Sequence, residues 1–388
     1  MTRGSAYLRR LLHFDRLPKA SFSSFLRSQF HLHLRTKAAR RRSDDDPDDR
    51  HRRDNAGDGG RRGGEHWDRS FRLDKGRGQY LLTNPRVLDT IARVAGLRPS
   101  DTVLEIGPGT GNLTARLLQS ARRVVAVEID PRMVDSVLSR ASRLGVDDRL
   151  TVITGDALKT AFPDFDICVA NIPYGISSPL IAKLLFSTSR PSSFRSAVLL
   201  LQKEFARRLV AVPGDSEFNR LAANVRLMAT VELLMDVSKK DFVPCPKVDS
   251  TLVRLQPRTD VPEVDLDEWL AFTRTCFSRK NKTLGAIFKQ KKRIAELLGR
   301  SKSEGRSTKI FMEQKQNDNG AEETDDDKCD DDDDDLLEQN ASEVSSFKEK
   351  VVGILKSGGF EGKRPSKISN EEFLHLLQLF NQNGVQFR

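Results

Sequence analysis

The chain has 388 residues, which is room for a full α/β domain, a smaller second domain and terminal tails. Only 37% of the residues are hydrophobic and the mean hydropathy is −0.50, so we expect part of the chain to be disordered. The four cysteines form no C-x-x-C pair and no apolar run reaches 18 residues, which argues against a cysteine-based zinc site, a disulfide scaffold and a membrane span.

The net charge of +10 at pH 7 combines two oppositely charged regions. Residues 322–338 contain twelve Asp or Glu and one Lys, a net charge of −11, so the remainder of the chain carries +21. Like charges at this density repel one another and keep the acidic run from collapsing. The basic excess elsewhere indicates a polyanionic partner.

Residues 1–43 contain eleven Lys or Arg and a single acid, Asp15. This arginine-rich, acid-poor composition is typical of an organellar transit peptide, and Leu8, Leu11 and Leu12 recur at helical spacing, as in a mitochondrial import helix. The alternatives are a basic RNA-binding arm and a nucleolar signal. Residues 44–70 alternate Asp, Arg and Gly without apolar periodicity, which predicts a disordered, solvated linker.

Residues 71–258 are predicted to form one α/β domain, because strands and helices alternate as in a parallel sheet with right-handed crossovers. The expected strands lie at residues 103–106, 123–127, 150–154, 166–170, 197–201, 231–237 and 251–256. The expected helices include residues 85–95, 178–186 and 203–212. The prolines between residues 241 and 250, Pro244 and Pro246, argue against a regular strand there.

The first strand runs into a glycine-rich turn, V-L-E-I-G-P-G-T-G-N-L-T over residues 103–114. Gly107, Gly109 and Gly111 allow the backbone to turn sharply and to approach a ligand, because they have no Cβ. The spacing is G-x-G-x-G and not the dinucleotide pattern G-x-G-x-x-G. The loop is therefore predicted to bind a nucleoside, without implying a phosphate cradle.

Polar residues stand at the carboxyl ends of the next three strands. Glu128 lies 21 residues after Gly107, where a doubly wound sheet places an acid that accepts hydrogen bonds from ribose hydroxyls. Gly155-Asp156-Ala157 and Asn171-Ile172-Pro173-Tyr174 follow the third and fourth strands. These ends are expected to define one crevice.

Residues 259–300 are predicted to form a small basic helical domain, with helices at 266–277 and 282–289. Residues 301–343 are predicted to be a disordered acidic segment, and residues 344–388 a C-terminal helical segment with amphipathic helices at 347–355 and 371–380. The basic domain carries a cluster that is dense enough to predict contact with phosphates. The cluster consists of Arg279, Lys280, Lys282, Lys289, Lys291, Lys292 and Arg293.

Together these features resemble the S-adenosylmethionine-dependent N6-adenine methyltransferases with an N-[ILP]-P-[YF] motif. Within that class, the segments G-Q-Y-L-L (78–82), Q-K-E-F-A-R-R-L (202–209) and P-K-V-D-S (246–250) resemble the rRNA adenine N6,N6-dimethyltransferases. The similarity covers about residues 74–258, and R-K-N-K-T-L (279–284) extends it toward the eukaryotic Dim branch. It implies a Rossmann-like class I fold with a small C-terminal helical domain that binds rRNA.

The resemblance also implies which residues hold S-adenosylmethionine. Glu128 is expected to bind the ribose, Asp156 the adenine amine and Gly107 the methionine side. Tyr80 departs from the Asn or His that is usual at its position. The complete expected set is Gln79, Tyr80, Leu82, Gly107, Gly109, Glu128, Asp156, Ala157 and Asn171.

The N-I-P-Y segment suits methyl transfer to an adenine amine, whose lone pair is delocalised into the ring. The Asn171 side-chain oxygen and the Ile172 carbonyl, which Pro173 helps to orient, would accept both N–H bonds and favour a tetrahedral nitrogen. Tyr174 offers a ring for the base to stack on, a contact of about 1–3 kcal/mol. By resemblance Phe242 forms the opposite wall. Neither a general base nor a metal is expected.

The expected function is dimethylation of adjacent adenosines near the 3′ end of small-subunit rRNA. We expect a mitochondrial monomer that acts on the pre-ribosomal small subunit. One alternative is a nucleolar enzyme acting on 18S-type rRNA, and another is a DNA N6-adenine methyltransferase, although those more often carry N-P-P-[YF]. A third is a ribosome-assembly or mitochondrial transcription factor that kept the fold without turnover; the intact site residues disfavour it.

Overall fold

The computed structural model describes residue 73 and residues 78–186, 194–303 and 341–387. All of these belong to one unit of the chain, which comprises Asp68–Glu313 and Lys328–Arg388. The predicted transit peptide (1–43) and linker (44–70) lie outside the described residues. Of the predicted acidic segment (301–343), only the first and last three residues are described, and they belong to helices.

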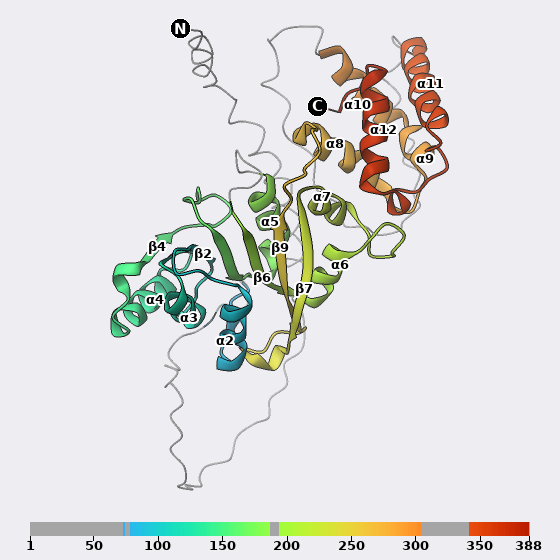
Figure 1. The fold of residues 1–388 in the computed structure, drawn as a ribbon. Helices are drawn as coiled ribbons and strands as arrows, with labels where there is room; N and C mark the ends of the chain where they lie inside the picture. Colours follow the sequence, from blue (N-terminus) through green and yellow to red (C-terminus); the bar gives the residue numbers. More distant parts are fainter. Residues whose placement is uncertain (1–72, 74–77, 187–193, 304–340, 388) are drawn as a thin grey trace, which may run out of the picture. The chain divides into compact units, whose positions relative to one another are not determined.

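A seven-stranded sheet forms the centre of this unit (Figure 1). Its strands are β2 (Thr102–Ile106), β3 (Arg123–Glu128), β4 (Leu150–Thr154), β5 (Ile167–Asn171), β6 (Ser196–Gln202), β7 (Ala229–Val237) and β9 (Ser250–Pro257). The order across the sheet is β4-β3-β2-β5-β6-β9-β7. The first five strands are parallel, and β9 runs antiparallel to both β6 and β7. Every expected strand is confirmed to within two residues at each end.

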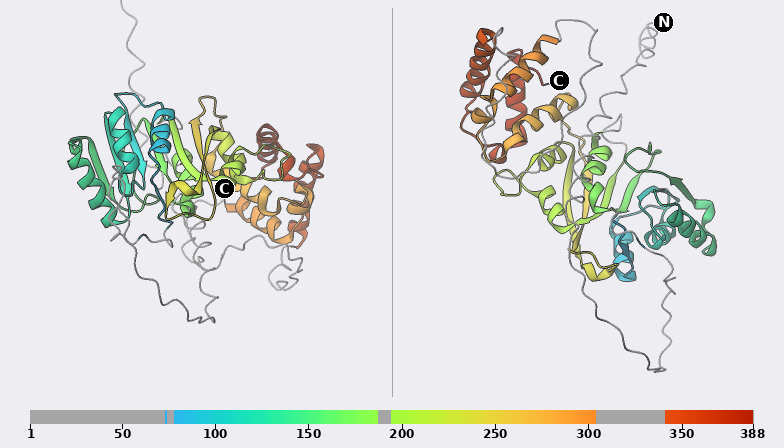
Figure 2. Two further views of the ribbon diagram at one scale, coloured as in Figure 1. Left: turned by 90° about the horizontal axis from the view of Figure 1, so that it is seen from below. Right: turned by 180° about the vertical axis from the view of Figure 1, so that it is seen from behind.

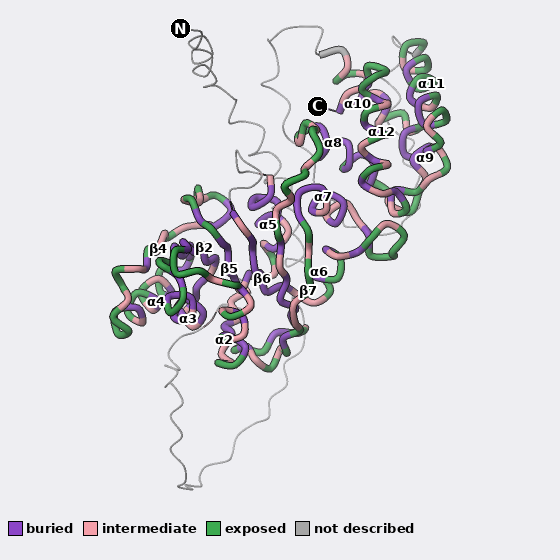
Figure 3. Tube along the Cα trace, viewed as in Figure 1, coloured by how far each residue is buried: buried purple, intermediate pink, exposed green. Residues whose placement is uncertain are grey.

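Helices cover both faces of the sheet (Figure 2). One face carries α2 (Pro85–Val94), α3 (Asn112–Ser120) and α4 (Pro131–Arg143). The other carries α5 (Ser177–Phe186), α6 (Lys203–Val210) and α7 (Arg220–Met228). Consecutive strand residues such as Val103 and Leu104 therefore lie in separate buried clusters, which is why the inner strands are mostly apolar (Figure 3).

A separate two-stranded antiparallel sheet joins β1 (Leu81–Leu82) to β8 (Phe242–Val243). Next to it, the Thr83 amide donates to the Asp241 carbonyl at 2.9 Å. The prediction that prolines exclude a regular strand from residues 241–250 is wrong for Phe242 and Val243. The reason is tertiary, since their partner strand comes from the beginning of the domain.

Beyond the sheet the chain forms further helices, α8 (Leu266–Cys276), α9 (Leu284–Phe288), α10 (Lys291–Ser303), α11 (Ala341–Ser357) and α12 (Asn370–Gln382). Short 3-10 turns are η2 (Asp147–Arg149), η3 (Tyr174–Ile176), η4 (Lys239–Asp241), η5 (Phe277–Arg279) and η7 (Pro365–Lys367). The C-terminal helices share one buried cluster with the α7 side of the sheet. Trp269 Nε1 donates to Asn224 Oδ1 at 3.0 Å, and Asn370 Nδ2 donates to the Ala223 carbonyl at 2.9 Å.

Helix prediction was less complete than strand prediction. The helices expected at 266–277, 347–355 and 371–380 are confirmed, whereas the one expected at 282–289 is shorter, because Thr283 caps α9 and the helix ends at Phe288. Neither α7 nor α10 was predicted. In the described ranges, no helix is long and apolar enough to cross a membrane.

Candidate active site

The candidate site lies at the carboxyl edge of the parallel strands. The chain leaves β2 for β3 and β4 on one side and returns to β5 on the other, so the topology switches between β2 and β5. Open α/β sheets bind ligands at such a switch point. The structure places the glycine loop, Glu128, Asp156 and Asn171 at the ends of β2, β3, β4 and β5, as the sequence predicted.

The glycine loop requires its glycines. Gly107, Gly109 and Gly111 have φ angles of +68°, +57° and +80°, a region that other residues rarely adopt. A Cβ on Gly109 would lie 2.6 Å from Leu81 Cδ2, whereas one on Gly107 would meet nothing closer than Pro173 Cδ at 3.8 Å. The loop therefore packs against β1 at Gly109 and leaves room beside Gly107, which fits a ligand close to the backbone.

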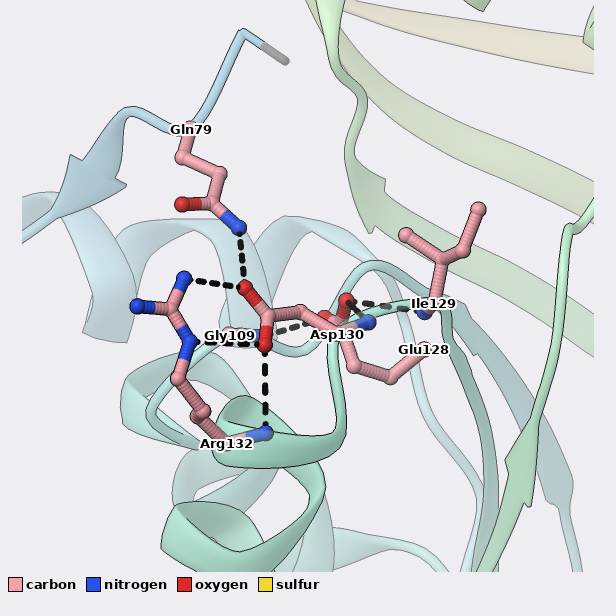
Figure 4. A network of polar contacts seen from close by, with 6 residues as sticks. All are labelled: Gln79, Gly109, Glu128, Ile129, Asp130 and Arg132. Carbon is pink, nitrogen blue, oxygen red and sulfur yellow. Dashed lines mark hydrogen bonds and ion pairs between the residues drawn. The ribbon is translucent and has the colours of Figure 1, made fainter. Parts of the chain in front are cut away.

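Glu128 is buried and held by backbone amides of two loops (Figure 4). Its Oε2 accepts from the Gly109 amide at 3.2 Å, and its Oε1 accepts from the Ile129 and Asp130 amides at 2.9 and 3.0 Å. Burial raises the pKa of Glu128, and the three amides oppose the shift. Since Oε2 accepts only one hydrogen bond within the described part, it retains a lone pair for a hydroxyl donor.

Asp130, which the sequence analysis did not single out, organises the same loop (Figure 4). It is 2% exposed and accepts from Gln79 Nε2 at 2.8 Å and from Arg132 Nη2 at 2.6 Å. The Arg132 guanidinium holds the pKa of Asp130 well below its usual range. Gln79, predicted to bind the cofactor, thus fastens the segment before β1 to the loop that carries Glu128. Ile129, which lies between Glu128 and Asp130 in the sequence, has an apolar side chain that is 55% exposed.

Asp156 forms the first residue of a turn after β4. Its Oδ1 accepts from the Leu158 amide at 2.9 Å, and its Oδ2 lies 3.7 Å from the exposed Lys159 Nζ. Gly155 links this turn to the Glu128 carbonyl by a hydrogen bond of 2.7 Å. Ala157 follows and is 8% exposed. Asp156 and Glu128 are thereby joined through the backbone of adjacent strand ends.

Asn171 is oriented by the segment before β1. Its Nδ2 donates to the Tyr80 carbonyl at 3.0 Å, which identifies the other amide atom as the oxygen. Within the described residues, no hydrogen bond uses Asn171 Oδ1, and no backbone amide donates to the Ile172 carbonyl. The start of the N-I-P-Y segment thus offers two acceptors whose lone pairs are unused.

Two tyrosines lie together beside these acceptors. The rings of Tyr80 and Tyr174 stack with centroids 5.8 Å apart and an interplanar angle of 25°. The Tyr174 hydroxyl shares a hydrogen bond of 2.9 Å with Ser250 Oγ, and burial raises its pKa. The Tyr174 ring is therefore fixed at both its face and its tip.

Phe242 and Leu82 are both buried. Phe242 was expected to face the target base and Leu82 the cofactor, but their side chains are 2% and 4% exposed and lie in the same buried cluster. They are partners in the β1–β8 ladder. Their side chains pack in that buried cluster, and Tyr80 is an aromatic residue adjacent to Tyr174.

A second carboxylate, Glu105, lies inside β2 directly before the glycine loop and was also not singled out. It is 1% exposed, and burial raises its pKa to about 8. The Thr114 hydroxyl opposes this shift, although Glu105 Oε2 and Thr114 Oγ1 have no hydrogen-bond partner in the described structure. Across the described ranges, no cluster of three His, Cys, Asp or Glu side chains could hold a metal.

A doubly wound sheet with one reversed strand, a glycine loop after its first strand and an acid at the end of the second defines a class I S-adenosylmethionine-dependent methyltransferase. The sequence matches the family described as Ribosomal RNA adenine dimethylase over residues 71–318. It therefore belongs to the ribosomal RNA adenine dimethylase family and is a methyltransferase.

Individual relatives agree with this assignment. The chain is 54% identical over 315 residues to the mitochondrial ribosomal RNA small subunit methyltransferase of Arabidopsis thaliana, covering 81% of this chain and 80% of that one. It is 50% identical over 335 residues to another ribosomal RNA small subunit methyltransferase of that plant, covering 83% and 94%. The crystal structure of a dimethyladenosine transferase from Plasmodium falciparum is similar, with a TM-score of 0.64 and 38% identity over 79% of this chain and 100% of that one.

Proposed function

We propose that this methyltransferase converts adjacent adenosines near the 3′ end of small-subunit rRNA to N6,N6-dimethyladenosine, and that it works in mitochondria. The observation that carries the proposal is the orientation of Asn171, whose Nδ2 donates to Tyr80 and whose Oδ1 is left as an acceptor. An adenine amine presents two N–H donors, and Oδ1 and the Ile172 carbonyl are acceptors on successive residues.

The chemistry needs positioning more than proton transfer, because the N6 nitrogen becomes an acidic cation when it takes the methyl group and then loses a proton to solvent. S-adenosylmethionine supplies an electrophilic sulfonium methyl when bound. Asn171 and Ile172 draw the two N6 hydrogens toward their oxygens, which directs the nitrogen lone pair outward and removes it from conjugation with the ring. Tyr174, anchored by Ser250, provides a stacking face for the base.

The cofactor residues proposed here follow the same edge of the sheet. Glu128 Oε2 accepts a ribose hydroxyl, Asp156 accepts from the adenine amine, and the backbone at Gly107 leaves room for the methionine part. Gln79 contributes indirectly by holding the segment before β1 to Asp130. Ile129 supplies an exposed apolar surface next to Glu128 that suits the flat face of adenine.

A single-turnover methylation assay tests this function. The unmodified protein is incubated with labelled S-adenosylmethionine and, in separate reactions, with small-subunit particles from mitochondria, with those from cytosol and with duplex DNA. We expect N6,N6-dimethyladenosine to form on the mitochondrial particle. Methylation of duplex DNA and not of the particles would support the DNA-enzyme alternative. If no substrate were methylated, the result would support the non-catalytic assembly factor.

Residues 1–43 are predicted to direct import into mitochondria because they are rich in arginine and nearly free of acid. The mitochondrial relative supports this location, although a similar relative without that designation leaves the nucleolus as the alternative. A fluorescent fusion of residues 44–388 should remain outside mitochondria, whereas the full-length fusion should enter. Entry of the truncated fusion, or accumulation of the full chain in nucleoli, would contradict the prediction.

Five members of the basic cluster divide into paired and unpaired cations. Lys289 Nζ lies 2.7 Å from Glu361, and Arg293 Nη1 lies 2.7 Å from Glu296. Arg279, Lys280 and Lys282 have no ion pair among the described residues. We propose that these three contact the rRNA backbone. A cation that is already paired with a carboxylate is less available to neutralise a phosphate, so it releases fewer counterions from the RNA.

Neutralising the unpaired set (Arg279→Gln, Lys280→Gln and Lys282→Gln together) should reduce the log–log salt dependence of rRNA binding by about 2, since each phosphate contact contributes roughly 0.7–0.9 to the slope. The control is Lys289→Gln with Arg293→Gln, which should change the slope by less than about 1. Filter binding across a range of salt concentrations measures both. Equal slopes for the triple variant and the unmodified protein would show that the unpaired set is an ordinary solvated surface.

A further inference from the structure

Lys183 is a buried charge on an otherwise apolar helix. α5 reads S-S-P-L-I-A-K-L-L-F, and Lys183 is only 8% exposed among buried leucine and isoleucine neighbours. Burying an ammonium is costly unless its donors are satisfied. A methionine or leucine would fill this position without the cost of burying a charge. The ammonium is therefore expected to have a role that an apolar side chain cannot fill.

The Lys183 ammonium donates hydrogen bonds to the turn that follows β4. Its Nζ donates to the Ala157 carbonyl at 2.7 Å and to the Thr160 carbonyl, and it stands 4.0 Å from the centroid of the Phe162 ring. Burial lowers the pKa of Lys183 to about 8, an effect that the charge of Asp156 opposes. The side chain is therefore predominantly a cation at neutral pH and binds both carbonyls by charge-assisted hydrogen bonds.

That turn begins at Asp156. The Asp156 carbonyl accepts from the amides of Lys159 and Thr160 at 2.9 and 2.8 Å, and its side chain accepts from Leu158. A single helical turn leaves its last carbonyls without partners inside the turn. Lys183 provides donors for two such carbonyls, so the placement of Asp156 and Ala157 depends on a side chain from another element.

The same helix begins immediately after the N-I-P-Y segment and η3. A rigid element thus connects the acceptors at Asn171 and Ile172 to the turn that carries Asp156. We propose that Lys183 is a positioning residue that fixes the Asp156 turn against α5 and thereby sets the affinity for the adenosyl part of the cofactor. This inference rests on the proposed function, because it takes S-adenosylmethionine as the ligand of that turn.

Lys183→Met tests the proposal, since methionine keeps most of the volume and removes the donors. Titration of the full-length protein with S-adenosylmethionine should show a dissociation constant raised by about tenfold, while the single-turnover rate at saturating cofactor stays within about threefold of the unmodified rate. The matched control is Lys159→Met. Lys159 lies on the same turn, 3.7 Å from Asp156, but its side chain is 81% exposed, so the constant should change by less than about twofold.

Phe162→Leu is a second variant in case Lys183→Met does not fold, which thermal melting would reveal. It removes the ring beneath the ammonium and should raise the dissociation constant by about threefold. Unchanged cofactor affinity in the folded variants, or a slower saturated rate with unchanged affinity, would overturn the role of Lys183. Failure of the unmodified protein to bind S-adenosylmethionine would overturn both proposals. Cofactor binding without RNA methylation would reject only the proposed function.

Discussion

Replacing Asn171 with Ala should slow the methyl-transfer step by about 10²–10³-fold, because one of two preorganised acceptors for the adenine N6 hydrogens is lost. The structure indicates that the group lost in this variant is the Oδ1 acceptor. Asn171 Nδ2 donates to the Tyr80 carbonyl, so the amide has one orientation, and its Oδ1 accepts nothing from the described residues. Single-turnover methylation of mitochondrial small-subunit particles at saturating cofactor isolates this step.

The Asn171→Ala variant should remain folded, since Asn171 is only partly buried and ends β5 outside the two buried clusters. Cofactor affinity should fall less than the rate, because the variant removes a group that faces the base. Asn171→Asp is an informative companion, since it keeps an acceptor but loses the donor to Tyr80. Near-normal dimethylation by Asn171→Ala at saturating cofactor would reject the proposed role of the amide.

Glu128→Ala should show the opposite pattern, with cofactor affinity as the larger loss. In the proposed site the carboxylate offers Oε2 to the ribose, and it also accepts hydrogen bonds from the Gly109, Ile129 and Asp130 amides. A hydrogen bond to a charged group contributes about 1.5–3 kcal/mol, so the dissociation constant should rise by about 10- to 100-fold. Calorimetric titration with S-adenosylmethionine measures it.

Part of that loss of affinity would come from disorder of the loop, and part from the missing acceptor for the ribose. Glu128→Gln separates these two causes. Glutamine retains one side-chain oxygen for the amides but removes the charge, so its affinity should lie between those of the Ala variant and the unmodified protein. Thermal melting of Glu128→Ala should show modest destabilisation, because three amides lose their acceptor. If Glu128→Ala bound the cofactor as tightly as the unmodified protein, another residue would have to hold the ribose.

The strands of this fold were predictable because sheet burial dictates composition locally. A strand such as β5 is covered on both faces along residues 167–170 and is apolar there, and that signal needs no knowledge of partners. The sequence analysis did not predict α7 or α10. In α10 the apolar residues at helical spacing, such as Ile294 and Leu297, lie beside the basic residues that were interpreted as a charge cluster. Their burial depends on contacts with distant parts of the chain.

The candidate site also contains residues whose position could be predicted from the sequence and residues whose position could not. Residues at strand ends, such as Glu128 and Asn171, were brought to one edge of the sheet as predicted, because parallel strands align their carboxyl ends. Phe242 was assigned by resemblance, and its burial with Leu82 follows from a strand pairing that residue order does not disclose. Lys183 gave a usable signal, since a lone charge in an apolar helix predicts a buried partner.

The central claim is tested most directly by mapping N6,N6-dimethyladenosine in small-subunit rRNA from cells that lack this protein. Our account predicts that two adjacent dimethyladenosines near the 3′ end of the mitochondrial small-subunit rRNA disappear while the cytosolic rRNA stays modified. Expression of the unmodified protein should restore them, and expression of the Asn171→Ala variant should not. Retention of both modified nucleotides in the mitochondrial rRNA, or their loss from the cytosolic rRNA alone, would contradict the account.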